Sequence, residues 1–160
     1  MIELLAEIDP RITGLEVLAP PSEAHRGVEP ILYIRDAHAG LLPLDAFGDG
    51  IRRILVIAFA ITFARNGVLL IDELETAIHF SALGRAFHWI VRACASNNVQ
   101  LFTTTHSLEA IDALLAADDA PKREDIVGYR LDASGQVVTT RRYGEDLLRR
   151  LRTERGLEVR

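Results

Sequence analysis

The sequence has very little cysteine and no long hydrophobic run. Cys94 is the only cysteine among 160 residues, so a disulfide framework is excluded and a reducing compartment such as the cytoplasm is favoured. The longest apolar stretch, Ile54 to Ala64, is too short to span a bilayer, which needs about 20 residues. The first residues do not combine a basic region with an apolar one, so no secretory signal is expected. These absences predict a cytoplasmic protein without a membrane partner.

Lysine is almost absent as well, and this excludes one specific motif. A phosphate-binding P-loop has the pattern Gly-x-x-x-x-Gly-Lys-[Ser/Thr]. The only lysine, Lys122, follows Ala120-Pro121 and precedes Arg123, so it does not belong to such a loop. The sequence therefore lacks the residues with which a P-loop holds phosphate groups.

The overall composition is that of an ordinary soluble globular domain. It is 49% hydrophobic and 26% charged, and 160 residues predict a single domain over residues 1–160. The net charge of −5 argues against a protein that coats nucleic acid. The arginine-rich segment 141–160 leaves contact with nucleic acid open, although a solvated helix face with paired acids is the commoner explanation.

Hydrophobic periodicity and turn residues predict an α/β fold. Residues 68–71 and 99–104 are expected strands on either side of a helix over about 81–96, and this order makes the two strands parallel. The other expected elements are helices over 1–8, 51–65, after Ser107 and over 145–155, extended segments around 14–19 and 31–35, a loop over 40–50, and a hairpin over 126–141. A left-handed stop is expected at Asn66-Gly67, a helix cap at Ser107, and helical pair spacing between Glu145 and Arg149.

The apolar run Val68–Ile71 ends in two carboxylates, Asp72 and Glu73. A run this apolar is typical of a strand buried on both faces. Because the carboxyl ends of parallel strands meet at one edge of a sheet, the acids should lie near residues 103–107, which include His106. Such a group suits a magnesium–phosphate ligand, with Asp72 at the metal, Glu73 orienting an attacking water, and His106 at the phosphate or that water.

A second candidate segment is Phe47-Gly48-Asp49-Gly50, directly before the helix over 51–65. Free amides at the start of a helix attract anions, and two glycines let a phosphate approach the backbone closely. Arg52 or Arg53 would add positive charge there. Taken alone, however, Gly-x-Gly before a helix is more often only a turn.

Together these segments resemble the C-terminal half of an ABC-type ATPase domain, in the AAA-family branch that includes OLD, RecF and SMC proteins. Gly48, Asp49 and Gly50 would occupy the signature motif, which reaches the nucleotide of a partner domain. Residues 68–73 resemble a Walker B motif, and residues 104–107 resemble the switch-histidine loop.

Residues 75–79 are similar to the D-loop of this branch, with His79 where a histidine is common, and the resemblance implies that His79 contacts the nucleotide. The resemblance implies a partial P-loop NTPase of the three-layer sandwich type, with parallel central strands and a C-terminal β-hairpin plus helix. It also implies ATP and Mg²⁺ as cofactors and a dimer of ATPase domains.

Two departures from the family pattern matter. The Walker A half has no counterpart, and Gly48 stands where the signature motif usually has serine. Without a Walker A strand beside it, the strand over 99–104 would expose an unpaired edge. A separate chain or an N-terminal half would then supply Walker A, the C-terminal hairpin would close the gap, or the chain would be a decayed fragment. The first and third outcomes are preferred.

Three functions fit these features. The leading hypothesis is an ATPase half-domain that binds ATP and hydrolyses it with Mg²⁺ once a Walker A-bearing partner docks. A non-catalytic interaction module derived from an ATPase is the first alternative. The second is a metal-dependent nuclease using Asp72, Glu73, Glu75 and His79, in which the last two would share a face only if their segment is helical.

Overall fold

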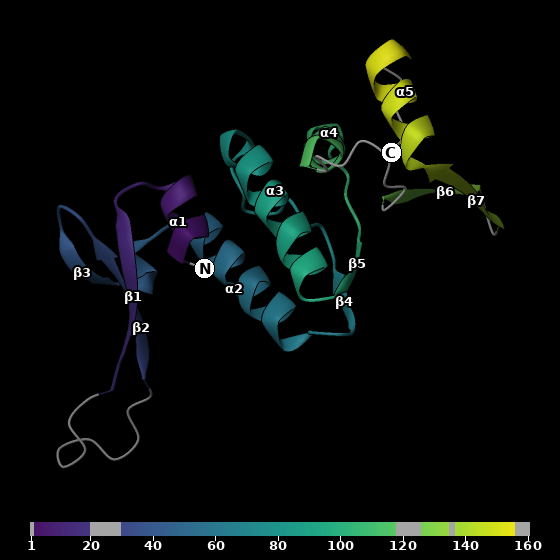
Figure 1. Cartoon of the computed structure of the whole chain (residues 1–160). Coiled ribbons are helices and arrows are strands. Elements are labelled where there is room, and N and C mark those ends of the chain that lie inside the picture. The colour runs from purple at the N-terminus through teal and green to yellow at the C-terminus, as the bar shows by residue number, and fades with distance from the viewer. Residues whose placement is uncertain (1, 20–29, 118–125, 135–136, 156–160) are drawn as a thin grey trace.

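The computed structural model describes residues 2–19, 30–117, 126–134 and 137–155 (Figure 1). Three groups of elements follow one another along the chain: an antiparallel sheet, a helical region with a parallel pair of strands, and a C-terminal hairpin with a helix. Across these described ranges, no helix is both long and apolar enough to cross a bilayer.

The N-terminal region joins a short helix to an antiparallel sheet. Helix α1 (Ile2–Ile8) leads into β1 (Ile12–Leu18), β2 (Ile31–Asp36) and β3 (Gly40–Pro43), which lie in the order β1-β2-β3. Leu5, Ile12 and Ile34 are almost fully buried, so the helix and the sheet contribute to one main core. The expected helix and both expected extended segments are confirmed here.

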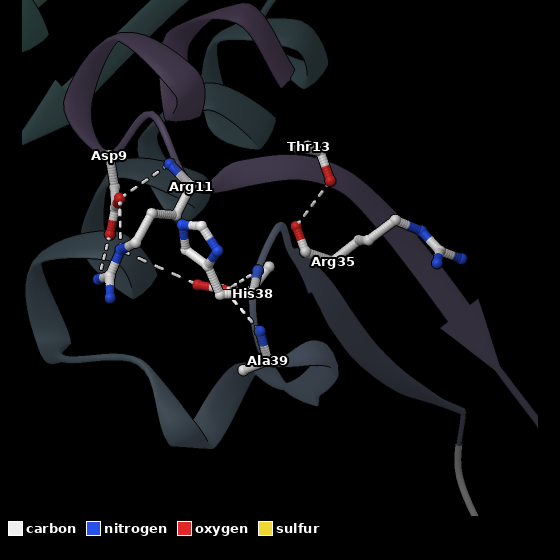
Figure 2. Close-up of polar contacts among 7 residues, drawn as sticks. Asp9, Arg11, Thr13, Arg35, His38 and Ala39 are labelled. Atoms are coloured by element: carbon white, nitrogen blue, oxygen red, sulfur yellow. Dashed lines mark hydrogen bonds and ion pairs between the residues drawn. The ribbon is translucent and has the colours of Figure 1, made fainter.

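Strand β3 corrects the sequence interpretation, which treated residues 40–50 as a loop. Four residues are too few to show a strand period, and the pairing of β3 with β2 depends on the turn between them. In that turn the Asp36 carboxylate accepts the backbone N–H groups of His38 at 2.8 Å and Ala39 at 2.9 Å (Figure 2). A short 3₁₀ helix, η1 (Leu44–Ala46), then leads to the start of α2.

Asp36 is also the centre of a polar cluster at this end of the sheet. Its side chain is only 6% exposed, and the Ala39 and His38 N–H groups hold the pKa of its carboxyl below the usual 3.8. The Arg11 guanidinium lies 3.9 Å from Asp36 and pairs with Asp9 at 2.8 Å (Figure 2). The cluster therefore fixes both the β2–β3 turn and the entry into β1.

The central region contains the predicted βαβ unit. Its elements are α2 (Asp49–Phe63), β4 (Val68–Ile71), α3 (Phe80–Ser96) and β5 (Gln100–Thr103), with β4 and β5 parallel. Asn66 after α2 has φ 58°, which confirms the expected left-handed stop there. Figure 1 shows α2 and α3 side by side, and both helices contribute buried residues to the main core.

Strand β4 is buried on one face only, and the expectation of burial on both faces is wrong. Leu69 and Ile71 pack against the main core. On the opposite face Val68, Leu70 and Phe102 are 56%, 75% and 49% exposed. Successive strand residues point to opposite faces, and in the described part of the chain the core covers one face alone. We call the surface formed by Val68, Leu70 and Phe102 the open face.

Helix α3 contributes more buried residues to the main core than any other described element. Phe87 is 0% exposed and Ile90 2%, and Cys94 lies in the same cluster at 6%. Burial raises the pKa of the Cys94 thiol to about 11, because the charged thiolate is disfavoured away from water. At neutral pH this thiol is therefore protonated and shielded from solvent.

The C-terminal region follows the predicted order of helix, hairpin and helix. It consists of α4 (Leu108–Ala117), β6 (Val127–Ser134), β7 (Val137–Gly144) and α5 (Glu145–Arg155). The expected hairpin is confirmed, although residues 135 and 136 of its turn lie outside the described residues. Within the described ranges the hairpin forms its own two-stranded sheet and does not pair with β5. It therefore does not close the edge of the parallel pair.

The arginines of α5 make ion pairs within the chain. Arg149 lies 2.6 Å from Glu145 one turn earlier, as the sequence spacing predicts. Arg152 binds both carboxylate oxygens of Asp112 in α4, each at 2.8 Å. The expected pairing with acids is confirmed, whereas Glu145 is only 4% exposed, so this part of the helix face is not solvated.

Candidate functional site

The carboxyl ends of β4 and β5 lie at the same edge of the parallel pair, as the sequence predicts. Backbone hydrogen bonds continue beyond the strands, from Thr104 N–H to the Ile71 carbonyl and from Leu74 N–H to the Thr104 carbonyl, both at 3.2 Å. The segment after β4 and the segment after β5 are therefore held next to each other. We call Asp72 and Glu73 the acid pair and residues 103–107 the threonine–histidine loop. The strand pairing places both at one site.

The Thr104 hydroxyl connects the two segments at the acid pair. It donates to the Asp72 carboxylate and accepts the backbone N–H of Glu73 at 2.9 Å. Glu73 has φ 47°, a left-handed conformation that costs a non-glycine residue about 1–3 kcal/mol. Its carboxylate accepts the Thr76 hydroxyl at 2.9 Å, while Asp72 and Glu73 both remain exposed. These hydrogen bonds offset the backbone strain and fix both carboxylates at the exposed edge.

Arg53 binds the backbone of the acid pair. Its guanidinium donates to the carbonyl oxygens of Asp72 at 2.9 Å and Glu73 at 3.2 Å. Arg52 pairs with Asp45 at 2.8 Å. Both arginines expected to add positive charge for a phosphate are therefore engaged within the chain, and Arg53 joins the first turns of α2 to the end of β4.

The two glycines of the Gly-x-Gly segment have different surroundings. A Cβ added at Gly48, the residue that caps α2, meets no atom within 4 Å. A Cβ added at Gly50 would lie 2.8 Å from the carbonyl oxygen of Ala77. Gly50 therefore allows α2 to pack closely on the turn after the acid pair, whereas the backbone at Gly48 is open to a ligand.

The segment from Leu74 to His79 consists of turns and is not helical. Glu75 and His79 therefore share no helix face, and the geometric premise of the nuclease hypothesis is wrong. His79 caps α3 instead: its Nδ1 accepts the backbone N–H of Ser81 at 3.4 Å and lies 2.9 Å from the Ser81 hydroxyl. The His79 ring is also tilted against Phe80, with centroids 4.5 Å apart.

His106 is exposed beside the acid pair, and Glu75 holds its backbone. The Glu75 Oε1 atom accepts the Thr105 hydroxyl at 2.7 Å and the His106 N–H at 3.1 Å. Ser107 then caps α4, as expected, by accepting the Ala110 N–H at 3.0 Å. No local pattern links Glu75 to this loop, because Glu75 and Thr105 are 30 positions apart and come together through the strand pairing.

The oxygen atoms at this edge suit Mg²⁺ better than a transition metal. Asp72 and Glu73 supply carboxylates and Thr104 a hydroxyl, and magnesium prefers such hard oxygen ligands. No cluster of three or more His, Cys, Asp or Glu side chains is arranged for metal binding among the described residues. A magnesium ion at Asp72 would accordingly take most of its ligands from water and a phosphate, as magnesium commonly does in proteins.

The parallel βαβ unit and its edge define an α/β domain of the ABC-type ATPase class. Two solved structures share the fold. The first is described as "Structural biochemistry of ATP-driven dimerization and DNA stimulated activation of SMC ATPases"; its TM-score is 0.64 at 13% identity, over 98% of this chain and 88% of that one. The second is an SMC head bound to the C-terminal winged-helix domain of ScpA, with TM-score 0.61 at 14% identity over 89% of this chain and 40% of that one.

The family follows from sequence comparison. A family model described as "AAA domain, putative AbiEii toxin, Type IV TA system" matches residues 13–112, and the chain belongs to this AAA domain family. Uncharacterized protein MJECL11 of Methanocaldococcus jannaschii is 38% identical over 101 residues, which are 63% of this chain and 80% of that protein.

A second relative is a much longer protein. An ATP/GTP phosphatase of Helicobacter pylori is 32% identical over 114 residues, which are 66% of this chain. The matched part makes up 30% of that phosphatase, so the likeness concerns one portion of it. The family and the fold together give this chain the general character of an ATPase-type domain.

Proposed function

We propose that the chain forms the C-terminal half of an ATP-hydrolysing site and completes it with a Walker A-bearing segment, in another chain or in an N-terminal half. The observation that carries this proposal is the junction of the acid pair with the threonine–histidine loop. Thr104 bridges the two segments by contacting Asp72 and Glu73, and Glu75 fixes the loop at His106. Asp72, Glu73 and His106 are all exposed at this edge, which supports a shared ligand there.

Each exposed group has a distinct role in this proposal. Asp72 would hold a magnesium ion through its bound water, and the ion would supply neutralisation of charge on the phosphates. Glu73, oriented by Thr76, accepts a hydrogen bond from the attacking water and aligns it with the terminal phosphate. His106 contacts that phosphate or the same water from the neighbouring loop.

The start of α2 supports dimerisation in the same proposal. Gly48, Asp49 and Gly50 form the amino end of a 15-residue helix, where unpaired N–H groups and the helix dipole favour an anion. The open backbone at Gly48 would meet the nucleotide of a second domain, and its amides would replace the contact of the usual serine. Arg53 and His79 act through the backbone here, by holding the acid pair and by capping α3.

The proposal is tested by measuring Mg²⁺-dependent ATP turnover with the purified full chain, alone and with a Walker A-bearing segment encoded beside it. Alone, the chain should bind ATP weakly or not at all and show negligible turnover. With the segment, Mg²⁺-dependent turnover should appear. Tight ATP binding by the chain alone would contradict the absence of a phosphate cradle. Docking without turnover would instead support the non-catalytic interaction module.

In the reconstituted pair, Glu73→Gln should reduce kcat by about 100-fold or more, because a group that orients or deprotonates the attacking water contributes about that much. ATP binding should stay unchanged, since glutamine has the same shape. Glu7→Gln, at an exposed position of α1, is the matched control and should retain full turnover. Unchanged turnover in Glu73→Gln would remove Glu73 from its assigned role.

A further inference from the structure

Glu75 accepts two hydrogen bonds from the loop that contains His106. One carboxylate oxygen, Oε1, lies 2.7 Å from the Thr105 hydroxyl and 3.1 Å from the His106 backbone nitrogen. In the part of the chain that the structure describes, these are the only hydrogen bonds that hold Thr105 and His106 to a different segment. The last backbone bond of the strand pairing ends one residue earlier, at the Thr104 carbonyl.

The backbone position of Glu75 is fixed by buried neighbours and by a turn hydrogen bond. The preceding Leu74 is 0% exposed and the nearby Ile78 is 8% exposed, and both belong to the main core. The Glu75 carbonyl accepts the Ile78 N–H at 3.0 Å, which closes the turn. An acceptor anchored on both sides in this way can define the position of a loop that has few other contacts.

The bridge continues from Glu75 into α4. The Thr105 hydroxyl, fixed by Glu75, accepts the Ser107 N–H at 3.0 Å, and the Ser107 hydroxyl accepts the Ala110 N–H at 3.0 Å in the first turn of α4. A single carboxylate thus connects the turn after the acid pair to the start of α4. His106 lies in the middle of this connection and is exposed.

An open pocket lies beside this bridge. Its volume is about 360 Å³, and it is lined by Glu75, Ile78, Phe80, Leu83, Ser107 and Glu109. The second carboxylate oxygen of Glu75, Oε2, is buried and has no hydrogen-bond partner among the described residues. If the Glu75 side chain is removed, the loop at His106 has room to shift instead of being held by packing.

We propose that Glu75 is a positioning residue that sets where His106 lies relative to Glu73. The role of His106 in turnover rests on the proposed function, whereas the position of its backbone does not. Glu75 touches neither water nor phosphate in this role. It acts through the two hydrogen bonds from the loop to Oε1.

The first experiment measures amide hydrogen exchange by NMR on the full chain without nucleotide. Glu75→Ala should speed exchange of the His106 N–H by at least about tenfold, the size expected for losing a hydrogen bond to a charged acceptor. Glu75→Gln keeps an acceptor oxygen. In this variant the exchange rate of the His106 N–H should therefore lie between the rates in wild type and in Glu75→Ala. The Gln100 N–H, bonded to the Gly67 carbonyl at 2.9 Å, is the internal reference and should not change.

Two further variants keep this test decisive. Thr105→Val removes the hydroxyl but leaves the His106 N–H bond, so it should have a smaller effect than Glu75→Ala and remain informative if Glu75→Ala unfolds. Glu7→Ala is the surface control and should match wild type. Equal His106 exchange in wild type, Glu75→Ala and Glu75→Gln would overturn the proposal.

The second experiment uses the reconstituted ATPase. Glu75→Ala should lower kcat by about tenfold with the KM for ATP within about twofold, and Glu75→Gln should restore most of the loss. A change in KM alone, or full activity in Glu75→Ala, would contradict a positioning role. If the wild-type pair shows no turnover while His106 exchange responds as expected, the ATPase proposal fails and the positioning of the loop by Glu75 still stands.

Discussion

The antiparallel sheet β1-β2-β3 and the parallel pair β4-β5 differ in how completely their strands are covered. Strand β2 has a hydrogen-bonded neighbour on each edge, and Ile34 within it is 0% exposed. Strands β4 and β5 pair only with each other among the described residues, and Leu70 is 75% exposed. Apart from the end where β1 stops and β2 begins, where Val17, Leu18 and Ile31 are 66%, 43% and 47% exposed, the antiparallel sheet is the better covered region.

The less covered region is the one that carries the candidate chemistry. Exposed apolar surface and unpaired strand edges favour association with another element, because pairing satisfies the backbone and burial removes apolar area from water. The open face lies on the same two strands whose ends hold the acid pair and His106. This agrees with the proposal that a Walker A-bearing segment pairs with this region and completes the site.

The prediction with the largest expected effect on stability compares side-chain burial in the antiparallel sheet and in the parallel pair. Ile34→Ala should lower the free energy of unfolding of the isolated chain by about 2–5 kcal/mol, because it leaves a cavity in the core. Leu70→Ala should change it by less than about 0.5 kcal/mol, since that side chain is largely solvated. Urea unfolding followed by circular dichroism measures both. Similar losses for the two variants would mean that the open face is covered in the isolated chain.

The next effect tests whether the start of α2 is packed against the turn after the acid pair. Gly50→Ala should destabilise the chain by about 1–3 kcal/mol, because its Cβ would overlap the Ala77 carbonyl oxygen. Gly48→Ala has free space and should cost less than about 1 kcal/mol, from the weaker capping preference of alanine. The same unfolding measurement compares them. Equal losses would show that both glycines serve only the helix cap.

The smallest effect concerns pH and the antiparallel sheet. The Ala39 and His38 N–H groups lower the pKa of Asp36 in the folded chain, so its stabilising contribution is present above the unfolded pKa near 3.8. That contribution is lost as the pH falls through the lower folded value. The difference in unfolding free energy between wild type and Asp36→Asn should therefore be constant at neutral pH and shrink below about pH 4. Denaturation curves at several pH values would show it, and a difference independent of pH would rule out this role.

Local patterns predicted the framework of the central region well. The bounds of β4, the parallel pairing through α3, and the meeting of Asp72 with the loop at Thr104 were all readable from an apolar run, a helix and a second run in order. These features depend on short-range periodicity and on the handedness of a βαβ unit. The left-handed stop at Asn66 was readable for the same reason, since it depends on a local turn preference.

The features that the sequence did not reveal depend on contacts between distant segments. Strand β3 exists because Asp36 fixes a turn, and four residues give no period to detect. The exposure of Leu70 depends on what covers the second face, which the apolar run itself does not state. The contact of Gly50 with Ala77 and the bridge from Glu75 to His106 span 27 and 31 positions and follow only from the folded arrangement.

The burial of Cys94 has a practical consequence. It is the only thiol in the sequence, and its raised pKa and small exposed fraction make it slow to react with maleimides or other thiol reagents. A cysteine introduced at position 70, on an exposed side chain, would then accept a fluorophore or spin label selectively in an otherwise unchanged chain. Quenching or immobilisation of that probe would report directly when another molecule covers β4.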